Sequence, residues 1–123
     1  MKIYAENIEQ KTLENKDYRR VVFTGKNSQL VLMNIQPGDE IGTEIHETHD
    51  QFFRVEAGQA KFTVNGDVFT GEDGFAVVVP AGVEHNVVNS GTEELKLYTI
   101  YSPAEHPEGT VHQTKSEALE AGH

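Results

Sequence analysis

Residues 38–58 read Gly38-Asp-Glu-Ile-Gly-Thr-Glu44-Ile-His46-Glu-Thr-His49-Asp-Gln51-Phe-Phe-Arg-Val-Glu-Ala-Gly58. Glu44 and His46 are two residues apart, and in an extended strand such side chains point to the same face. A short turn around residues 48–50 would make a hairpin that brings Gln51 back towards that face. The stretch therefore gathers a carboxylate, an imidazole and an amide oxygen, which are ligands for a metal ion.

A second stretch, residues 74–89, offers a fourth ligand. It reads Gly74-Phe-Ala-Val-Val-Val-Pro80-Ala-Gly82-Val-Glu-His85-Asn-Val-Val-Asn89. An apolar run ends here in a Pro/Gly turn, and a histidine follows at once. The expected metal ligands are therefore Glu44, His46, Gln51 and His85.

Together the two stretches resemble the motifs of the cupin superfamily, G-x5-H-x-H-x3,4-E-x6-G and G-x5-P-x-G-x2-H-x3-N. The second motif is matched at every position, by Gly74, Pro80, Gly82, His85 and Asn89, and Gly38 and Gly58 frame the first. Glu44 stands where the family usually has its first histidine, and Gln51 stands where it has glutamate. The resemblance implies a small single-domain cupin, a jelly-roll (double-stranded β-helix) barrel with a metal site.

The rest of the chain predicts an all-β protein. Runs of strand-forming residues recur at 21–24, 29–36, 51–55, 61–64, 68–70, 75–79, 85–88 and 95–101. Asn65-Gly66 predicts a tight hairpin, because both central residues of a type I′ turn need positive φ. The capping-box spacing of Thr114-Lys-Ser-Glu117 predicts a short C-terminal helix. We expect one cupin domain over residues 1–123, with the barrel at about 20–101 and a C-terminal loop and helix at 102–123.

Residues 1–20 are polar with isolated apolar positions, and they are interpreted as a lead-in segment. Residues 29–36 are apolar on both faces. One face would meet the barrel interior, and the other needs a second sheet or a partner subunit, since exposed apolar patches usually mark interfaces. Because small cupins, which the chain resembles, are also often dimeric, we expect a homodimer.

Composition narrows the classes of partner and compartment. The chain has no cysteine, so any metal must be held by oxygen and imidazole nitrogen. A net charge of −10 with scattered basic residues argues against nucleic acid. The first residues lack the apolar core of a signal peptide, and no stretch is long and apolar enough for a membrane span, which predicts a cytoplasmic protein without a membrane partner.

Two imidazoles and a carboxylate suit Zn, Fe, Mn, Ni or Co, and the sequence does not choose among these metals. Gln51 either binds the ion directly or hydrogen-bonds another ligand. With Gln51 bound, an isomerase or cyclase acting on a small carbonyl, enediol or sugar-like substrate is favoured. Without it, two histidines and one carboxylate remain, which is the composition of Fe(II) dioxygenases. No general base is evident, so a non-catalytic metal- or ligand-binding module is the alternative.

The other histidines are interpreted as exposed loop or tail residues: His49 as a reserve ligand, and His106 and His112 as parts of a solvated tail. The alternative is that the Pro-rich loop with His106 and His112 folds over the barrel mouth. By alternation from Gln51, Arg54 should point away from the ligands.

The aromatic residues Phe53, Phe62, Tyr98 and Tyr101 are expected in the core or barrel lining. The tail after residue 102 also resembles that of phosphomannose-isomerase-like cupins. No basic residue is expected to line the pocket, however, which disfavours a sugar-phosphate substrate.

Overall fold

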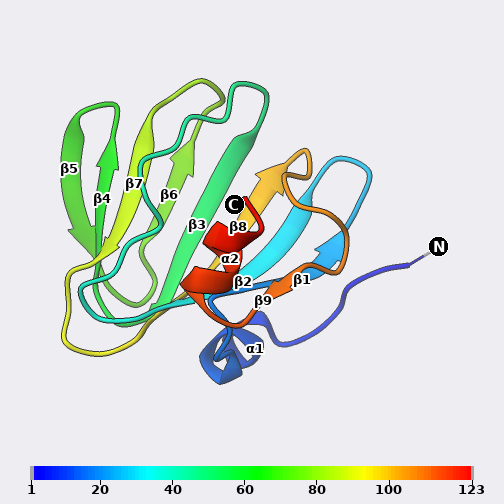
Figure 1. Cartoon of the computed structure of the whole chain (residues 1–123), viewed down its shortest axis with the longest axis horizontal. Coiled ribbons are helices and arrows are strands. Elements are labelled where there is room, and N and C mark those ends of the chain that lie inside the picture. The colour runs from blue at the N-terminus through cyan, green and yellow to red at the C-terminus, as the bar shows by residue number, and fades with distance from the viewer. Residues whose placement is uncertain (1, 123) are drawn as a thin grey trace.

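The computed structural model of the chain describes residues 2–122 and consists of two antiparallel β-sheets packed face to face (Figure 1). The six-stranded sheet has the order β6-β3-β8-β2-β1-β9, with β1 (Arg19–Thr24), β2 (Gln29–Ile35), β3 (Asp50–Ala57), β6 (Ala76–Val79), β8 (Leu95–Ser102) and β9 (Val111–His112). The three-stranded sheet has the order β5-β4-β7, with β4 (Ala60–Val64), β5 (Asp67–Gly71) and β7 (His85–Asn89). The described part of the chain also contains two helices, α1 (Ile8–Glu14) and α2 (Lys115–Glu120). The predicted all-β jelly roll with a short C-terminal helix is confirmed.

The core lies between the inner faces of the two sheets. Along β8 the burial alternates strictly, so that Leu95, Leu97, Thr99 and Tyr101 point inward. Phe53 of β3 meets Phe62 of β4 across the interior, with ring centroids 5.8 Å apart. The inward side chains become polar toward the C-terminal end of β8, and this end holds the candidate site.

Two turn predictions are confirmed. Asn65 and Gly66 have φ of 51° and 85°, as a type I′ hairpin between β4 and β5 requires. Thr114 caps α2, because its side-chain oxygen accepts a hydrogen bond from the Glu117 amide at 3.2 Å.

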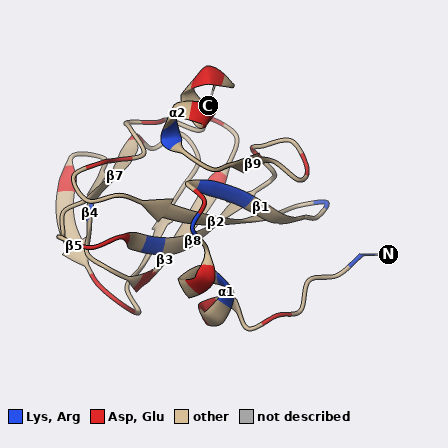
Figure 2. Cartoon of the chain, turned by 60° about the horizontal axis from the view of Figure 1, so that its bottom comes forward, with Lys and Arg blue, Asp and Glu red and all other residues tan. Residues whose placement is uncertain are grey.

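The N-terminal lead-in contains a helix, α1, that the sequence analysis did not predict. Asn7 caps this helix by accepting from the Gln10 amide at 2.9 Å. The helix packs on β2, β3 and β8, on the outer face of the six-stranded sheet (Figure 2). The chain itself therefore covers the outer face of β2, and no second sheet or partner subunit is needed there.

The tail is also more ordered than expected, because β9 pairs with β1 and completes the six-stranded sheet. Arg19 lies opposite His112, and Arg20 lies opposite Val111. The sheet thus extends beyond the barrel limits of residues 20–101. Neither helix approaches the length of a membrane span, and residues 2–122 contain no other helix that could cross one.

Candidate metal centre

The backbone places Glu44 directly opposite His85. Each of these residues donates its amide to the carbonyl of the other, at 2.8 and 2.9 Å, and the Ile41 amide donates to the Val87 carbonyl at 2.9 Å. The segment before β3 therefore pairs with β7 in the three-stranded sheet. The expected hairpin between Glu44 and Gln51 was wrong, because the chain passes from one sheet to the other between them. Glu44 and His85 nevertheless meet, since directly opposed residues share a face.

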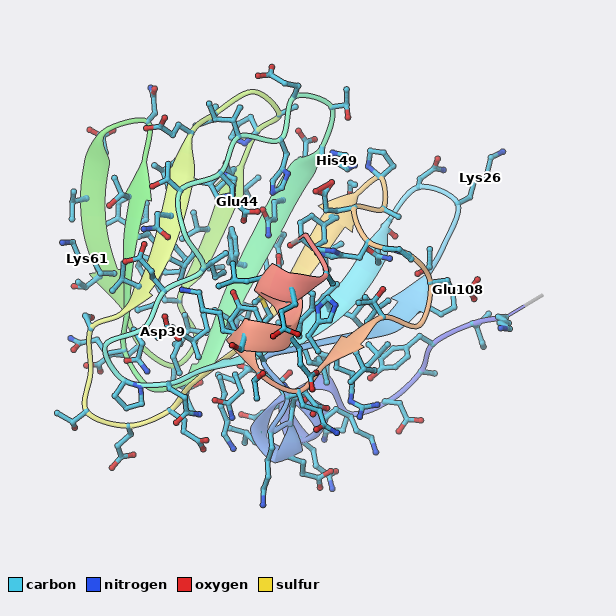
Figure 3. The ribbon with its side chains drawn as sticks, viewed as in Figure 1. Lys26, Asp39, Glu44, His49, Lys61 and Glu108 are labelled. Atoms are coloured by element: carbon cyan, nitrogen blue, oxygen red, sulfur yellow. The ribbon has the colours of Figure 1, made fainter. Side chains whose placement is uncertain are left out.

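His46 and Gln51 approach the same place from other elements. The carbonyl of His46 accepts from the amide of Gly82, at 2.9 Å, which ties the two motif stretches together. Gln51 is buried on β3, where it lies opposite both Val79 and Tyr101. Figure 3 shows Glu44 and His49 at one end of the barrel, whereas Lys26 and Lys61 lie at the periphery.

One ligand atom from each of Glu44, His46 and His85 lies within 4.8 Å of the others. Nε2 of His46 is 3.8 Å from Oε1 of Glu44, too far for a hydrogen bond, and this buried nitrogen has no hydrogen-bond partner among residues 2–122. His46 and His85 are only 9% and 4% exposed, while the Glu44 side chain is 34% exposed. The three side chains are thus close enough to share one ion.

His85 has a hydrogen-bond acceptor on both sides of its ring. Nδ1 lies 3.0 Å from the Val83 carbonyl, and Nε2 lies 3.0 Å from Oε1 of Gln51. A neutral imidazole has one N–H and satisfies only one of these acceptors. An ion between Nε2 and Oε1 would remove the conflict, because adjacent ligands about 2.1 Å from an ion, at right angles, are about 3 Å apart. The donor set therefore fits a divalent transition metal.

Glu105 is a site residue that the sequence analysis missed. Its Oε2 lies 3.4 Å from Nδ1 of His46, and its Oε1 lies 3.7 Å from Nε2 of His49. Glu44 is the main cause of the raised pKa of His46, and Glu105 adds to it while burial opposes it. His49 also binds the Ala104 carbonyl at 2.9 Å and is largely buried, so its interpretation as an exposed loop residue was wrong.

Tyr101 lies against the candidate ligands, as predicted for a barrel-lining residue. Its ring packs edge-on against His46 and against His106, with centroids 5.7 and 5.2 Å apart. Burial, and then the charge of Glu44, raises the pKa of Tyr101, so the phenol stays protonated. Both His106 and His112 are buried, and the expectation of a solvated tail was wrong.

The side chains of Arg54, Phe53 and Phe62 point in the predicted directions, and that of Tyr98 does not. Arg54 points away from the site as predicted, and its Nε lies 3.3 Å from Oε1 of Glu56. Phe53 and Phe62 are core residues, as predicted. Tyr98 is not, because it lies half-buried on the outer face of β8 beside Phe52.

Arg19 is a basic side chain on the inner face of the six-stranded sheet. It is 3% exposed and lies opposite the buried residues Met33 and His112. The sequence analysis, which expected no basic residue in the pocket, did not foresee a buried arginine on this face.

Comparisons with known proteins agree with this architecture. Residues 31–101 match the cupin domain family. The protein YrkC of Bacillus subtilis is 44% identical over 126 residues, which cover 98% of this chain and 68% of YrkC. The crystal structure of BH2720 from Bacillus halodurans has a TM-score of 0.95 and 42% identity, and the match covers 97% of this chain and 95% of that one.

The likeness to mannose-phosphate enzymes is more distant. A mannose-1-phosphate guanylyltransferase of Salmonella montevideo is 30% identical over 80 residues, which cover 65% of this chain and only 17% of that enzyme. The family match covers more than half of the chain, and YrkC is similar along nearly all of it. The chain therefore belongs to the cupin family.

Proposed function

We propose that this cupin binds one divalent transition metal ion through Glu44, His46 and His85, with the amide oxygen of Gln51 as a fourth donor. We further propose that it is a small metal-dependent enzyme acting on a carbonyl, enediol or sugar-like substrate. The observation that carries the proposal is the convergence of the first three ligand atoms within 4.8 Å. Zn, Fe, Mn, Ni or Co would suit this donor set.

A bound ion would supply Lewis-acid chemistry, since two neutral imidazoles and one carboxylate leave it a net positive charge. The chain's own residues prepare the ligands. Glu105 lies 3.4 Å from Nδ1 of His46, and the Val83 carbonyl lies 3.0 Å from Nδ1 of His85. A proton on each Nδ1 would leave each Nε2 free to bind the ion. The ring of Tyr101 packs edge-on against His46, and its hydroxyl lies 3.4 Å from Nε2 of His106.

The position of Gln51 favours an isomerase or cyclase over a dioxygenase. Its Oε1 lies 3.0 Å from Nε2 of His85, where it would be an additional ligand. Its Nε2 donates to Oγ1 of Thr99 at 3.0 Å, which keeps the oxygen directed at the centre.

A non-catalytic binding module is the second candidate, and the contacts of Glu105 favour it. This carboxylate faces both His46 and His49, so it is engaged rather than available as a general base.

The test is a screen of the Zn-, Mn- and Fe(II)-loaded protein against small carbonyl, enediol and phosphosugar compounds, following turnover and oxygen uptake. We expect turnover that is abolished in His85→Ala and kept in Glu84→Ala, an exposed neighbour. Oxygen uptake lost in His85→Ala would select the dioxygenase. Saturable binding without turnover under every metal would reject the enzyme and select the binding module.

A further inference from the structure

Among residues 2–122, the buried guanidinium of Arg19 has no carboxylate partner. Its Nη1 lies 3.3 Å from Nδ1 of His112, and its buried Nε has no hydrogen-bond partner among residues 2–122. In the same part of the chain, no Asp or Glu forms an ion pair with it. Buried charges in folded proteins are normally paired, so the position of Arg19 is suited to binding an anion.

The neighbours of Arg19 orient the guanidinium but do not neutralise it. The ring of Tyr18 lies 5.2 Å from its Cζ, which is cation–π distance. Because a guanidinium only donates, Nδ1 of His112 must accept, and the imidazole is then neutral with its proton on Nε2. A neutral ring on each side leaves the positive charge intact.

Arg19 faces the same interior as the candidate metal centre. It lies opposite Met33 of β2, which in turn lies opposite Leu97, an inward residue of β8. Tyr101, which packs against His46, points to the same side of β8. The adjacent Arg20 behaves differently. It is exposed on the outer face and bonds Asp17 at 2.8 Å.

We propose that Arg19, oriented by Tyr18 and His112, binds the carboxylate of a small organic acid inside the barrel. The other end of this acid would reach the centre formed by Glu44, His46 and His85, so the inference rests on the proposed function and names its substrate class. A single planar guanidinium matches the two oxygens of a carboxylate. A phosphate dianion would call for a second cation, and the chain carries a net charge of −10.

The test compares malonate with its neutral analogue malonamide and with inorganic phosphate, at constant ionic strength, by calorimetric titration and thermal unfolding. The proteins are wild type, Arg19→Gln and the matched control Arg20→Gln, each with and without metal. We expect malonate to raise the unfolding midpoint by roughly 5–10 °C at about 100 times its dissociation constant, and malonamide to leave it unchanged. Arg19→Gln should weaken malonate binding about 10- to 100-fold, and Arg20→Gln should not.

Without malonate, Arg19→Gln should unfold at the wild-type temperature or above it, because the variant removes an unpaired buried charge. A large drop in that temperature would mean a structural role and overturn the proposal. Equal binding of malonate and malonamide, tighter binding of phosphate, or unchanged malonate binding in Arg19→Gln would also overturn it. If Arg19→Gln does not fold, the comparison of malonate with malonamide on the wild-type protein tests the proposal: equal binding of the two compounds would overturn it.

Metal content, measured on the same samples, distinguishes a failure of this inference from a failure of the proposed function. Bound metal without malonate binding overturns the inference alone. Arg19-dependent malonate binding in a protein that takes up no metal supports the carboxylate site and overturns the proposed metal function alone.

Discussion

The carboxylate of Glu105 lies 3.4 Å from Nδ1 of His46, while Nε2 of the same ring lies 3.8 Å from Glu44. A proton on Nδ1, the nitrogen that faces Glu105, would leave the lone pair of Nε2 on the side of Glu44. Such carboxylate–histidine contacts orient metal ligands and raise their basicity.

Replacing Glu105 by Gln is predicted to weaken metal binding about 10- to 100-fold. The measurement is a competition titration against a chromogenic chelator. Glu108→Gln is the matched control, since Glu108 is on the same loop and its one ion pair within residues 2–122 is with the exposed Lys2, at 3.5 Å. Equal affinity of Glu105→Gln and wild type would contradict the role of Glu105.

Glu56 gives a prediction about pH. Burial is the largest cause of its raised pKa, and the charge of Arg54 lowers the pKa by less than burial raises it. A carboxyl group with a raised folded-state pKa stabilises the fold below its unfolded pKa, and that stability is lost as pH rises through the folded pKa.

Glu56→Gln should therefore raise the free energy of unfolding at pH 7 by on the order of 1 kcal/mol, and the gain should vanish near pH 4. Urea unfolding at a series of pH values measures it, with the exposed Glu93→Gln as the control. A loss of stability at neutral pH would show that the ion pair with Arg54 outweighs the burial of the charge.

Individual side chains were predictable from sequence where a motif fixed both the residue and its backbone. Glu44, His46 and His85 lie together because the motif spacing places them on paired segments. Arg19 and Glu105 were not predictable, because they lie outside both motifs and reach the barrel interior only through sheet pairing and the loop after β8.

At the scale of elements, two glycines that frame the first motif have different physical roles. Gly38 and Gly58 both have positive φ, of 79° and 87°. A Cβ on Gly38 would meet nothing within 4 Å, whereas one on Gly58 would lie 2.6 Å from the Glu94 carbonyl oxygen and 2.9 Å from Cα of Leu95. Only Gly58 is needed for close packing as well as for its backbone angle.

Gly38→Ala is therefore predicted to lower the free energy of unfolding by about 1–2 kcal/mol, the cost of a left-handed alanine. Gly58→Ala should cost clearly more, about 3 kcal/mol or above, because the backbone of residues 94–95 must also move. Urea unfolding of the two variants side by side tests this. Equal losses would contradict the close-packing argument.

The strands were predictable because runs of strand-forming residues alternate with turn signals such as Asn65-Gly66. Helix α1 was missed because it has only seven residues and little apolar periodicity, although Asn7 and Gln10 have capping spacing. The prediction of a hairpin between Glu44 and Gln51 was wrong for another reason, because sequence spacing does not show which sheet a strand joins. Strand β9 has two residues, too few to show a pattern.

At the scale of the whole molecule, the homodimer stays a prediction, now with a different surface. Helix α1 covers the outer face of β2, but Val68 and Val78 are 59% and 65% exposed on β5 and β6. Strand β6 is an edge of the six-stranded sheet, and edge strands offer unpaired backbone groups to a second chain.

Light scattering at micromolar concentration should give twice the chain mass of 13.7 kDa. Val78→Lys should shift the mass toward the monomer, and Ile3→Lys, an exposed residue outside the sheets, should not. A monomeric wild-type protein would rule out the dimer.

The metal site is the claim on which the proposed chemistry depends, and elemental analysis tests it most directly. Protein made in metal-replete medium and dialysed should carry about one divalent transition metal ion per chain. Glu44→Gln and His46→Ala should lose most of it, while Glu47→Gln, an exposed glutamate three residues from Glu44, should keep it. Far less than one ion per wild-type chain, or unchanged metal content in both ligand variants, would contradict the account.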